Sequence, residues 1–302
     1  MQPFSFYLSH PRTTLLYIFN TFSYLLPDRL HLRIEFWLKK GKRLHLNNPQ
    51  TFCEKIQWLK LYNRKPEYTM MVDKLAVKTY VAEKIGREYV IPVLGVWDKP
   101  EDIDFASLPE QFVLKTSHGG GSNGVFICKD KHIMNKMKVV SKMRKAMRLN
   151  IYKRNLEWPY KNVQKKIFAE QYMEDPTGTS DLLDYKWYCF NGEPKYCQVI
   201  KDRKTKETID FFDTEWRHQE FIGLNPNVEY AIDTPAPPSK LDEQIRIARK
   251  LSKDIPFSRI DLYEINGEIF FGEITFYPAS GMGGFRPEKY DEILGQMLVL
   301  QK

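Results

Sequence analysis

The chain has 302 residues, of which 42% are hydrophobic and 28% charged, enough for one large core or about two to three subdomains. This balance excludes wholesale disorder. The four cysteines lack the Cys-x-x-Cys spacing of a zinc site or disulfide framework. Residues 1–9 lack the basic start and the cleavage site of a signal peptide. We therefore expect a cytoplasmic protein.

The first 70 residues are predicted to be a helical region. The apolar run 15–26 is too short and too polar to span a bilayer. The cation-rich, amphipathic segment 30–43 follows it, and either packs onto the body or makes a peripheral contact with the inner face of a membrane. Thr51 and Glu54 form a capping-box pattern that opens a helix through Tyr62. A second helix is expected near 73–85, closed by Gly86.

Alternating and buried-type apolar patterns predict several strands in the middle of the chain. The expected strands cover 91–97, 111–116, 125–128 and 166–173, with a hairpin of 184–190 and 194–200 around Asn191-Gly192. A further helix is expected at 241–252 and another at the C-terminus. Short antiparallel units mixed with helices indicate an α+β protein instead of a continuous βαβ sheet.

The net charge of +8 is concentrated in residues 129–166, which hold 13 Lys and Arg against Asp130 and Glu157. The segment is expected to be helical, and its recurring Met134, Met137, Met143 and Met147 indicate a packing face. Its cations form either a solvated face or a patch that attracts polyanions. No nucleic-acid-binding signature accompanies the charge, so we expect no nucleic-acid partner.

A glycine-rich segment, 117–124, connects two of the predicted strands and directly follows Lys115. Glycines allow backbone N–H groups to approach phosphate oxygens closely, and a lysine adds a positive charge. The lysine precedes the glycines, so this is not a Walker loop. A phosphate-binding loop and an ordinary glycine-rich turn both fit the pattern.

A second informative segment, 258–275, reads as a β-hairpin around Asn266-Gly267. A three-residue loop, 266–268, would place Asp261 directly across from Glu273, whereas a two-residue turn would separate them onto opposite faces. We predict the three-residue loop. It puts Arg259, Asp261, Glu273 and Thr275 on one face, and it puts Ile260, Leu262, Phe270, Ile274 and Phe276 on the other. Two facing carboxylates suit a hard cation such as Mg²⁺, although scattered charge on an edge hairpin is the plainer interpretation.

The charged residues follow a fixed order: Lys74, Lys115 with its glycine loop, Glu170, Lys186, and the Arg259/Asp261 and Glu273/Thr275 pairs. This order resembles the ATP-grasp superfamily of carboxylate–amine ligases over about residues 72–297. Segments 48–58, 72–75, 114–121 and 271–275 further resemble its teichuronopeptide-biosynthesis, TupA-like, branch. The resemblance implies an α+β ATP-grasp fold in which two antiparallel-sheet subdomains clasp a nucleotide. We expect a helical region at 1–70 and the ATP-grasp domain at 71–302, with a glycine-loop lid at 112–168 and a metal- and acceptor-binding core at 169–302.

The same resemblance implies ATP with Mg²⁺, or Mn²⁺ in its place. It implies that the nucleotide contacts are Lys74, Lys115, His118, Gly119, Gly120, Gly121, Ser122, Glu170 and Tyr172. The strand 170–173 would meet the adenine. Asp261, Glu273 and Thr275 would hold the metal, although many ATP-grasp enzymes carry Asn at the position of Thr275. Lys186 would lie near the transferring phosphate, and Arg259 would steady an acyl phosphate. Asp202, Arg203, Ser280 and Gly281 are candidate acceptor contacts, or equally a surface ion pair and a turn.

The expected activity is therefore an ATP-dependent ligation of a carboxylate to an amine through an acyl phosphate. The branch resemblance suggests capsule or other cell-surface polysaccharide biosynthesis, with a uronic acid joined to an amino acid or amino sugar. One alternative is a glycosyltransferase of polysaccharide assembly, although the only close acidic pair, Asp102 and Asp104, sits in a proline-flanked loop. The other is a non-catalytic basic protein that binds a membrane or polyanion through 129–166.

Overall fold

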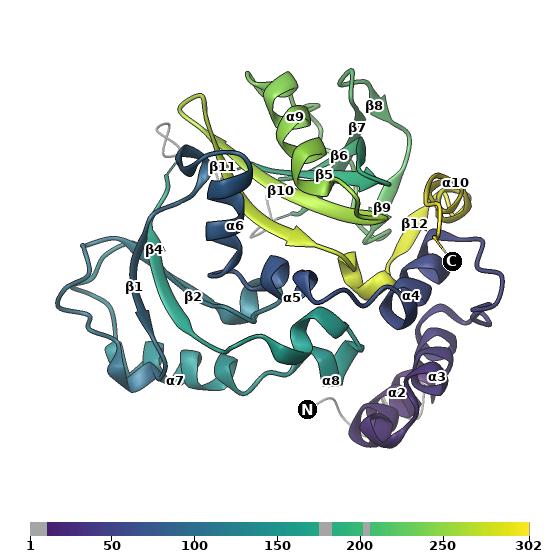
Figure 1. Cartoon of the computed structure of the whole chain (residues 1–302), viewed down its shortest axis with the longest axis horizontal. Helices are drawn as coiled ribbons and strands as arrows, with labels where there is room; N and C mark the ends of the chain where they lie inside the picture. Colours follow the sequence, from purple (N-terminus) through teal and green to yellow (C-terminus); the bar gives the residue numbers. More distant parts are fainter. Residues whose placement is uncertain (1–10, 175–182, 202–205, 302) are drawn as a thin grey trace.

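The computed structural model describes residues 11–174, 183–201 and 206–301. Two antiparallel sheets dominate it, with helices between and around them (Figure 1). The smaller sheet has the strand order β1-β4-β2-β3. Its strands are β1 (Val93–Trp97), β2 (Phe112–Thr116), β3 (Val125–Cys128) and β4 (Ile167–Gln171). All its pairings are antiparallel, which places residues far apart in the sequence, such as Lys115 and Phe168, side by side.

The larger sheet has the strand order β11-β10-β5-β6-β7-β8. These strands are β5 (Asp184–Phe190), β6 (Glu193–Lys201), β7 (Thr208–Asp213), β8 (His218–Gln219), β10 (Phe257–Ile265) and β11 (Glu268–Thr275). Two short strands, β9 (Ile222–Leu224) and β12 (Gly284–Arg286), pair separately. The predicted hairpin of β5 and β6 is confirmed, because Asn191 and Gly192 both adopt the positive φ that a tight turn requires (52° and 85°).

The helices of the N-terminal half are α2 (Pro11–Phe22), α3 (Asp28–Lys40), α4 (Phe52–Tyr62), α5 (Glu67–Val72) and α6 (Val77–Lys84). The predicted capping box opens α4, since Thr51 and Glu54 exchange side-chain-to-backbone hydrogen bonds. The helix predicted to begin at Asp73 instead begins at Val77. Asp73 ends α5, and its side chain accepts hydrogen bonds from the N–H groups of Leu75 and Ala76. Lys74 is therefore held in a turn between two helices.

Two cores support the two sheets. In the smaller one, α7 (Lys136–Met147) covers the sheet with the buried side chains of Val139 and Met143. The predicted methionine packing face is thus correct for Met143 and wrong for Met137, which is 81% exposed. In the larger core, Phe52 of α4 makes edge-on ring contacts with Phe190 and Phe257 of the large sheet. These contacts attach the N-terminal helices firmly to the large sheet.

The remaining helices are α8 (Ile151–Asn155), α9 (Leu241–Ser252) and α10 (Tyr290–Met297). Helix α9 packs on the large sheet, while α5 and α6 lie between the two sheets (Figure 1). Helices α2 and α3 form a hairpin at the periphery, beside α4 (Figure 1). Within the described ranges, no helix is both long and apolar enough to cross a lipid bilayer.

Candidate functional site

The β10–β11 hairpin brings its two acidic residues together as predicted, but by a different route. Asp261 pairs with Glu273, and Arg259 pairs with Thr275. The predicted three-residue loop is wrong, because the turn is only Asn266-Gly267, with Ile265 paired to Glu268. A β-bulge at Gly272 supplies the extra residue that a longer loop would have supplied. Beyond the bulge, the pairing returns to the register that aligns the carboxylates.

Close backbone approach explains why a glycine occupies the bulge. A Cβ on Gly272 would lie 3.0 Å from the carbonyl oxygen of Asp261 and 3.0 Å from the ring of Tyr263. The bulge also changes which side chains enter the core. Phe271 is buried, whereas Phe270, which we placed on the apolar face, is only partly buried. Between the turn and Gly272, the bulge therefore exchanges the side chains that face the core with those that face away from it.

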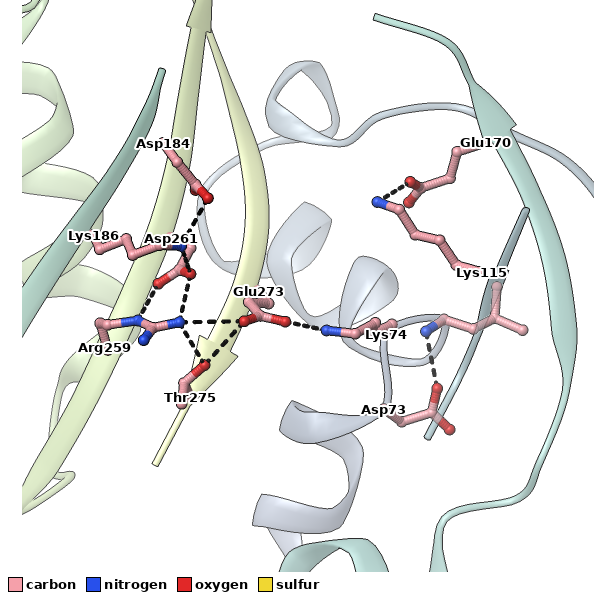
Figure 2. Close-up of polar contacts among 11 residues, drawn as sticks. Asp73, Lys74, Lys115, Glu170, Asp184, Lys186, Arg259, Asp261, Glu273 and Thr275 are labelled. Atoms are coloured by element: carbon pink, nitrogen blue, oxygen red, sulfur yellow. Dashed lines mark hydrogen bonds and ion pairs between the residues drawn. The ribbon is translucent and has the colours of Figure 1, made fainter. Parts of the chain in front are cut away.

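Four residues of this hairpin form one hydrogen-bonded group (Figure 2). The guanidinium of Arg259 donates from Nε to Asp261 Oδ1 and from Nη2 to Asp261 Oδ2, both at 2.7 Å. Its Nη2 also lies 3.3 Å from Glu273 Oε1 and 3.3 Å from Thr275 Oγ1. The Thr275 hydroxyl donates to Glu273 Oε1 at 3.2 Å. We call Arg259, Asp261, Glu273 and Thr275 the hairpin cluster.

Lys186 enters the hairpin cluster from the neighbouring strand β5, where it pairs directly with Asp261. Its ammonium contacts the Asp261 carboxylate and lies 2.8 Å from Asp184 Oδ2. Lys186, Asp184 and Asp261 are all less than 10% exposed. A buried ammonium held between two carboxylates has a fixed position, which suits a group that must meet one particular oxygen of a ligand.

Lys74 connects the hairpin cluster to the smaller sheet. Its ammonium forms an ion pair with Glu273 (Figure 2). Its backbone N–H donates to the carbonyl of Ser117 at 2.9 Å. Ser117 is the first residue of the glycine-rich segment. One residue between α5 and α6 is therefore bonded both to the carboxylate pair and to the start of the glycine loop.

The cations decide the charge state of the cluster. Burial alone would raise the pKa of Glu273, but Lys74, Arg259 and Lys186 outweigh it and hold that pKa well below its usual range. Burial likewise disfavours the charged guanidinium of Arg259, but Asp261 outweighs it, so the pKa of Arg259 lies above its usual value. Both side chains remain ionised at neutral pH.

The donor set fits a small hard cation. Mg²⁺ commonly takes one or two carboxylates and keeps waters or phosphate oxygens for its other positions. Asp261 and Glu273 supply such a pair, and the Thr275 hydroxyl lies beside it. The described residues contain no group of three or more His, Cys, Asp and Glu placed to hold a metal by themselves. A cation at the Asp261–Glu273 pair would take water or phosphate oxygens at its other positions.

On the smaller sheet, Lys115 of β2 and Glu170 of β4 form an ion pair at 2.5 Å. Lys78 of α6 approaches the same carboxylate at 2.6 Å. Burial raises the pKa of Glu170, but Lys115 and Lys78 outweigh it and keep the pKa below its usual value. The Glu170 carboxylate thus lies between two lysines. Its contact with adenine stays a prediction. Tyr172, the other predicted adenine neighbour, has Lys129 5.9 Å from its ring centre.

The glycine loop is built around Thr116. A Cβ on Gly119 would lie 2.5 Å from the Thr116 hydroxyl oxygen, and one on Gly124 would lie 2.3 Å from it. Both positions therefore require glycine. Gly121 is needed for a different reason, its φ of 61°. Ser122 lies in the same turn as Gly121, and Gly120 directly precedes that turn, although the side chain of Ser122 is outside the described part.

His118 differs from the rest of the loop, because its side chain is buried. Burial, aided by the positive charge of Lys165, lowers the pKa of His118 to about 4, from an ordinary value of 6.5. The imidazole is therefore neutral near pH 7. Any contact of His118 with phosphate would come from its backbone N–H.

This buried histidine predicts a pH-dependent stability. The unfolded chain takes up a proton at His118 below about pH 6.5, whereas the folded chain resists protonation down to about pH 4. The contribution of His118 to the free energy of unfolding is therefore full above about pH 6.5, its pKa in the unfolded chain. Up to about 3 kcal/mol of this contribution is lost as the pH falls from about 6.5 to about 4. His118→Leu should flatten that part of the profile in urea titrations. His132→Gln, at an exposed histidine, should keep the wild-type profile, and an unchanged slope in His118→Leu would contradict the assignment.

The predicted acceptor residues fall into two groups. Asp202 and Arg203 lie outside the described residues. Ser280 and Gly281 lie in the turn Pro278–Gly281 directly after β11, where Ala279, Ser280 and Gly281 have consecutive positive φ values of 46°, 56° and 63°. Two non-glycine residues in this conformation are strained and need outside support. We call this turn the acceptor loop.

Support for the acceptor loop comes from α4. Gln57 donates to the carbonyls of Ser280 and Gly281 at 3.1 and 3.0 Å. The fully buried ammonium of Lys60 donates to the carbonyl and hydroxyl oxygens of Ser280 at 2.9 and 2.7 Å, and to the Asn155 carbonyl at 2.9 Å. Burial lowers the pKa of Lys60 to about 8, although nearby Glu157 opposes this. Lys60 therefore remains mostly charged at neutral pH.

Lys60→Met is expected to destabilise the protein by about 2–4 kcal/mol, because it leaves buried acceptors of the strained loop without their donor. Urea denaturation measures this change. Lys55→Met is the matched control on the same helix. Lys55 also donates to two carbonyls, at 2.7 and 2.8 Å, but is only partly buried, so about 1 kcal/mol is expected. Equal losses in both variants would show that the strained loop has no special need for Lys60.

Three residues of the site were not predicted from the sequence: Lys78, Asp184 and Lys60. Lys78 lies four residues after Lys74, and Asp184 lies two residues before Lys186 on the same strand. Strand alternation places Asp184 and Lys186 on one face, so this pair could have been found. Nothing in the spacing of Lys60 indicates a contact with residue 280, which is 220 positions away.

A family model of TupA-like ATP-grasp proteins matches residues 54–299. No curated protein matches the chain at a significant level. Solved structures of low identity also match. D-alanine–D-alanine ligase from Bacillus anthracis is 16% identical with a TM-score of 0.43, covering 76% of this chain and 66% of that one. The corresponding ligase from Helicobacter pylori is 14% identical with a TM-score of 0.42, covering 82% and 69%.

The ATP-grasp ligase PsnB, complexed with a minimal precursor, Mg and ADP, is 13% identical with a TM-score of 0.39, covering 81% of this chain and 64% of that one. The chain thus spans about two thirds of the length of the ligases that it matches. The fold is an α+β ATP-grasp fold with antiparallel sheets, as the sequence predicted.

Proposed function

The chain belongs to the TupA-like ATP-grasp family, and we propose that it is an ATP-dependent ligase that joins a carboxylate to an amine. One observation carries this proposal. Lys74 is bonded at once to the Glu273 carboxylate of the hairpin cluster and to Ser117 at the start of the glycine loop. A metal-type carboxylate pair and a phosphate-type loop are therefore adjacent. Their juxtaposition supports a site for a nucleotide triphosphate with its cation, between the two sheets.

The proposed reaction has two steps. A carboxylate oxygen of the substrate forms a bond to the γ-phosphorus of ATP as the bond to ADP breaks, which gives an acyl phosphate and ADP. The amine nitrogen then bonds to the acyl carbon as inorganic phosphate leaves, and the nitrogen releases a proton to solvent. Such chemistry depends on positioning and on stabilising charged oxygens, not on a protein nucleophile.

The described side chains fit these tasks. Lys115 would bind nucleotide phosphates, and Lys186, fixed between two carboxylates, would meet the oxygens of the transferring group. The Arg259 guanidinium would hold the acyl phosphate. When bound at Asp261 and Glu273, Mg²⁺ or Mn²⁺ would neutralise phosphate charge. Lys74 would leave Glu273 for a phosphate oxygen, since its long side chain can move farther than the hairpin backbone.

For the substrates, we propose a uronic acid of a capsule or other surface polysaccharide and an amino acid or amino sugar. The acceptor loop would receive one of them, because only two residues separate it from β11, the strand that carries Glu273 and Thr275. The supporting fact is membership of the TupA-like branch. The family match also favours the ligase over the glycosyltransferase. We also propose that residues 71–302 form the ATP-grasp domain and that residues 112–168 form its lid.

The decisive experiment measures ADP release with ATP and Mg²⁺, across uronic-acid glycosides paired with amino acids or amino sugars. The expected result is ADP that appears only when both acceptors are present. Mass spectrometry should then find a product equal to the two acceptors less one water. Folded protein that hydrolyses sugar nucleotides and leaves ATP intact would overturn the proposal in favour of a glycosyltransferase.

A further inference from the structure

The helical hairpin of α2 and α3 exposes an unusual group of apolar side chains. Sixteen large hydrophobic side chains are exposed in the described ranges, and six of them lie between residues 15 and 37. Around the turn and along α3, these are Phe22, Tyr24, Leu25, Leu30 and Trp37, each between 44% and 69% exposed. We call these five residues the hairpin surface. Its apolar density far exceeds that of the rest of the described chain.

This surface is not the face by which the hairpin packs. Helix α3 buries Leu32, Phe36 and Leu38 on one side. Leu30, Arg33 and Trp37, spaced three and four residues apart, lie on the other side and are exposed. The helix thus has one apolar face that contacts the protein and a second, mixed apolar and basic stripe that faces outward.

Positive charge surrounds the hairpin surface. Residues 29–43 contain six Lys and Arg and a single acid, Glu35. Glu35 is buried, and its carboxylate forms an ion pair with Lys39 at 2.5 Å. The charge of Glu35 is therefore directed inward, and Asp28, at the start of α3, is paired with Arg64 at 2.6 Å. In contrast, Arg29, Arg33 and Arg43 are exposed. The outer side of the hairpin presents cations and apolar groups together.

We propose that the hairpin surface binds an anionic lipid bilayer. Leucine and phenylalanine enter the acyl boundary, tryptophan and tyrosine prefer the headgroup level, and arginine and lysine meet anionic headgroups. All three classes occur together here, which is why a membrane fits better than a neutral protein partner. Ile133 and Met137 are a second exposed apolar pair, but the aromatic ring beside Ile133, that of Phe126, is partly buried, so this pair is not included.

The other end of α3 lies beside the candidate site. Lys40, the last residue of α3, donates from its ammonium to the carbonyl of Gly283 at 2.7 Å. Gly283 is two residues beyond the acceptor loop. Binding of the hairpin surface would therefore hold the acceptor loop near the bilayer. The membrane proposal rests on exposure and charge alone and is independent of the ligase activity.

Sedimentation of the whole protein with lipid vesicles tests this proposal. We expect binding to vesicles of mixed phosphatidylcholine and phosphatidylglycerol, and little binding to phosphatidylcholine alone. Arg33→Glu should weaken binding roughly 25-fold, since it removes one positive charge and adds a negative one, and each unit of charge near an anionic surface changes affinity by about fivefold. Leu25→Glu combined with Leu30→Glu should weaken it at least about tenfold, because both side chains are exposed in the free protein.

Ile133→Glu is the control, at an exposed apolar residue that precedes α7 and lies outside the hairpin surface, and it should bind vesicles like the wild type. Thermal unfolding checks that each variant is folded. Absence of vesicle binding at low salt would overturn the proposal. So would a concentration-dependent dimer, seen by light scattering, that the Leu25/Leu30 variant abolishes without any change in lipid binding. Equal loss of binding in Ile133→Glu would also reject this surface in favour of the surface around Ile133.

Discussion

Glu273→Gln is expected to lower acceptor-dependent ADP release by at least about 10²–10³-fold while leaving the fold intact. The amide keeps nearly the same shape and can still accept a hydrogen bond from Thr275, but it loses the charge that pairs with Lys74 and would neutralise a cation. About a third of the Glu273 side chain is exposed, so the cost in stability should be small, about 1 kcal/mol or less. Steady-state kinetics and urea denaturation measure the two effects separately.

Glu268→Gln provides the control for this variant. Glu268 begins the same strand and has only an exposed contact with Lys240 at 3.5 Å. It should turn over ATP like the wild type. If Glu273→Gln retained wild-type turnover, the assignment of the hairpin cluster as the cation site would be wrong, whatever the substrates are.

Asp261→Asn is expected to abolish turnover and also to destabilise the protein by about 3–5 kcal/mol. Asp261 is only 1% exposed and accepts from both Arg259 and Lys186. The neutral amide would leave two buried cations without their main partner. The midpoint of urea denaturation should therefore fall well below that of Glu273→Gln, although the two variants lose a similar amount of activity.

Asp210→Asn separates the two effects. Asp210 is also 1% exposed, but it lies on β7, where it contacts His218 at 2.9 Å, away from the hairpin cluster. This variant should lose stability and keep the wild-type turnover number at temperatures where it is folded. Wild-type stability of Asp261→Asn would show that Arg259 and Lys186 do not depend on this carboxylate.

The sequence predicts the elements of this fold well where the signal is local. The Asn191-Gly192 turn and the Thr51/Glu54 capping box depend on neighbouring residues, and both were found. The start of α6 was missed, because the Asp73 carboxylate caps a turn through Leu75 and Ala76, and the helix begins only after that turn, at Val77. The bulge at Gly272 was also missed. A glycine in a strand permits a bulge, but only the packing of both faces requires one.

The candidate site was predicted as a set of residues but not as a set of contacts. Strand pairing within one hairpin could bring Asp261 to Glu273 on paper, because the separation along the chain is short. The ion pair of Lys74 with Glu273 joins residues 199 positions apart, and the three acceptors of Lys60 lie on two distant segments. Such contacts follow from how the sheets and helices pack, which no local spacing encodes.

The bulge at Gly272 also affects how this chain should be compared with its relatives. The acidic pair can be brought into register in two ways: by a two-residue turn with a bulge, as here, or by a three-residue turn without one. The number of residues between Asp261 and Glu273 is the same in both. A gapless alignment would therefore match the acids while superimposing turn residues on strand residues. Evolutionary rates or coupled substitutions read from such columns would mix two structural environments between 262 and 272. An alignment guided by strand pairing would open paired gaps, one in the turn and one at Gly272.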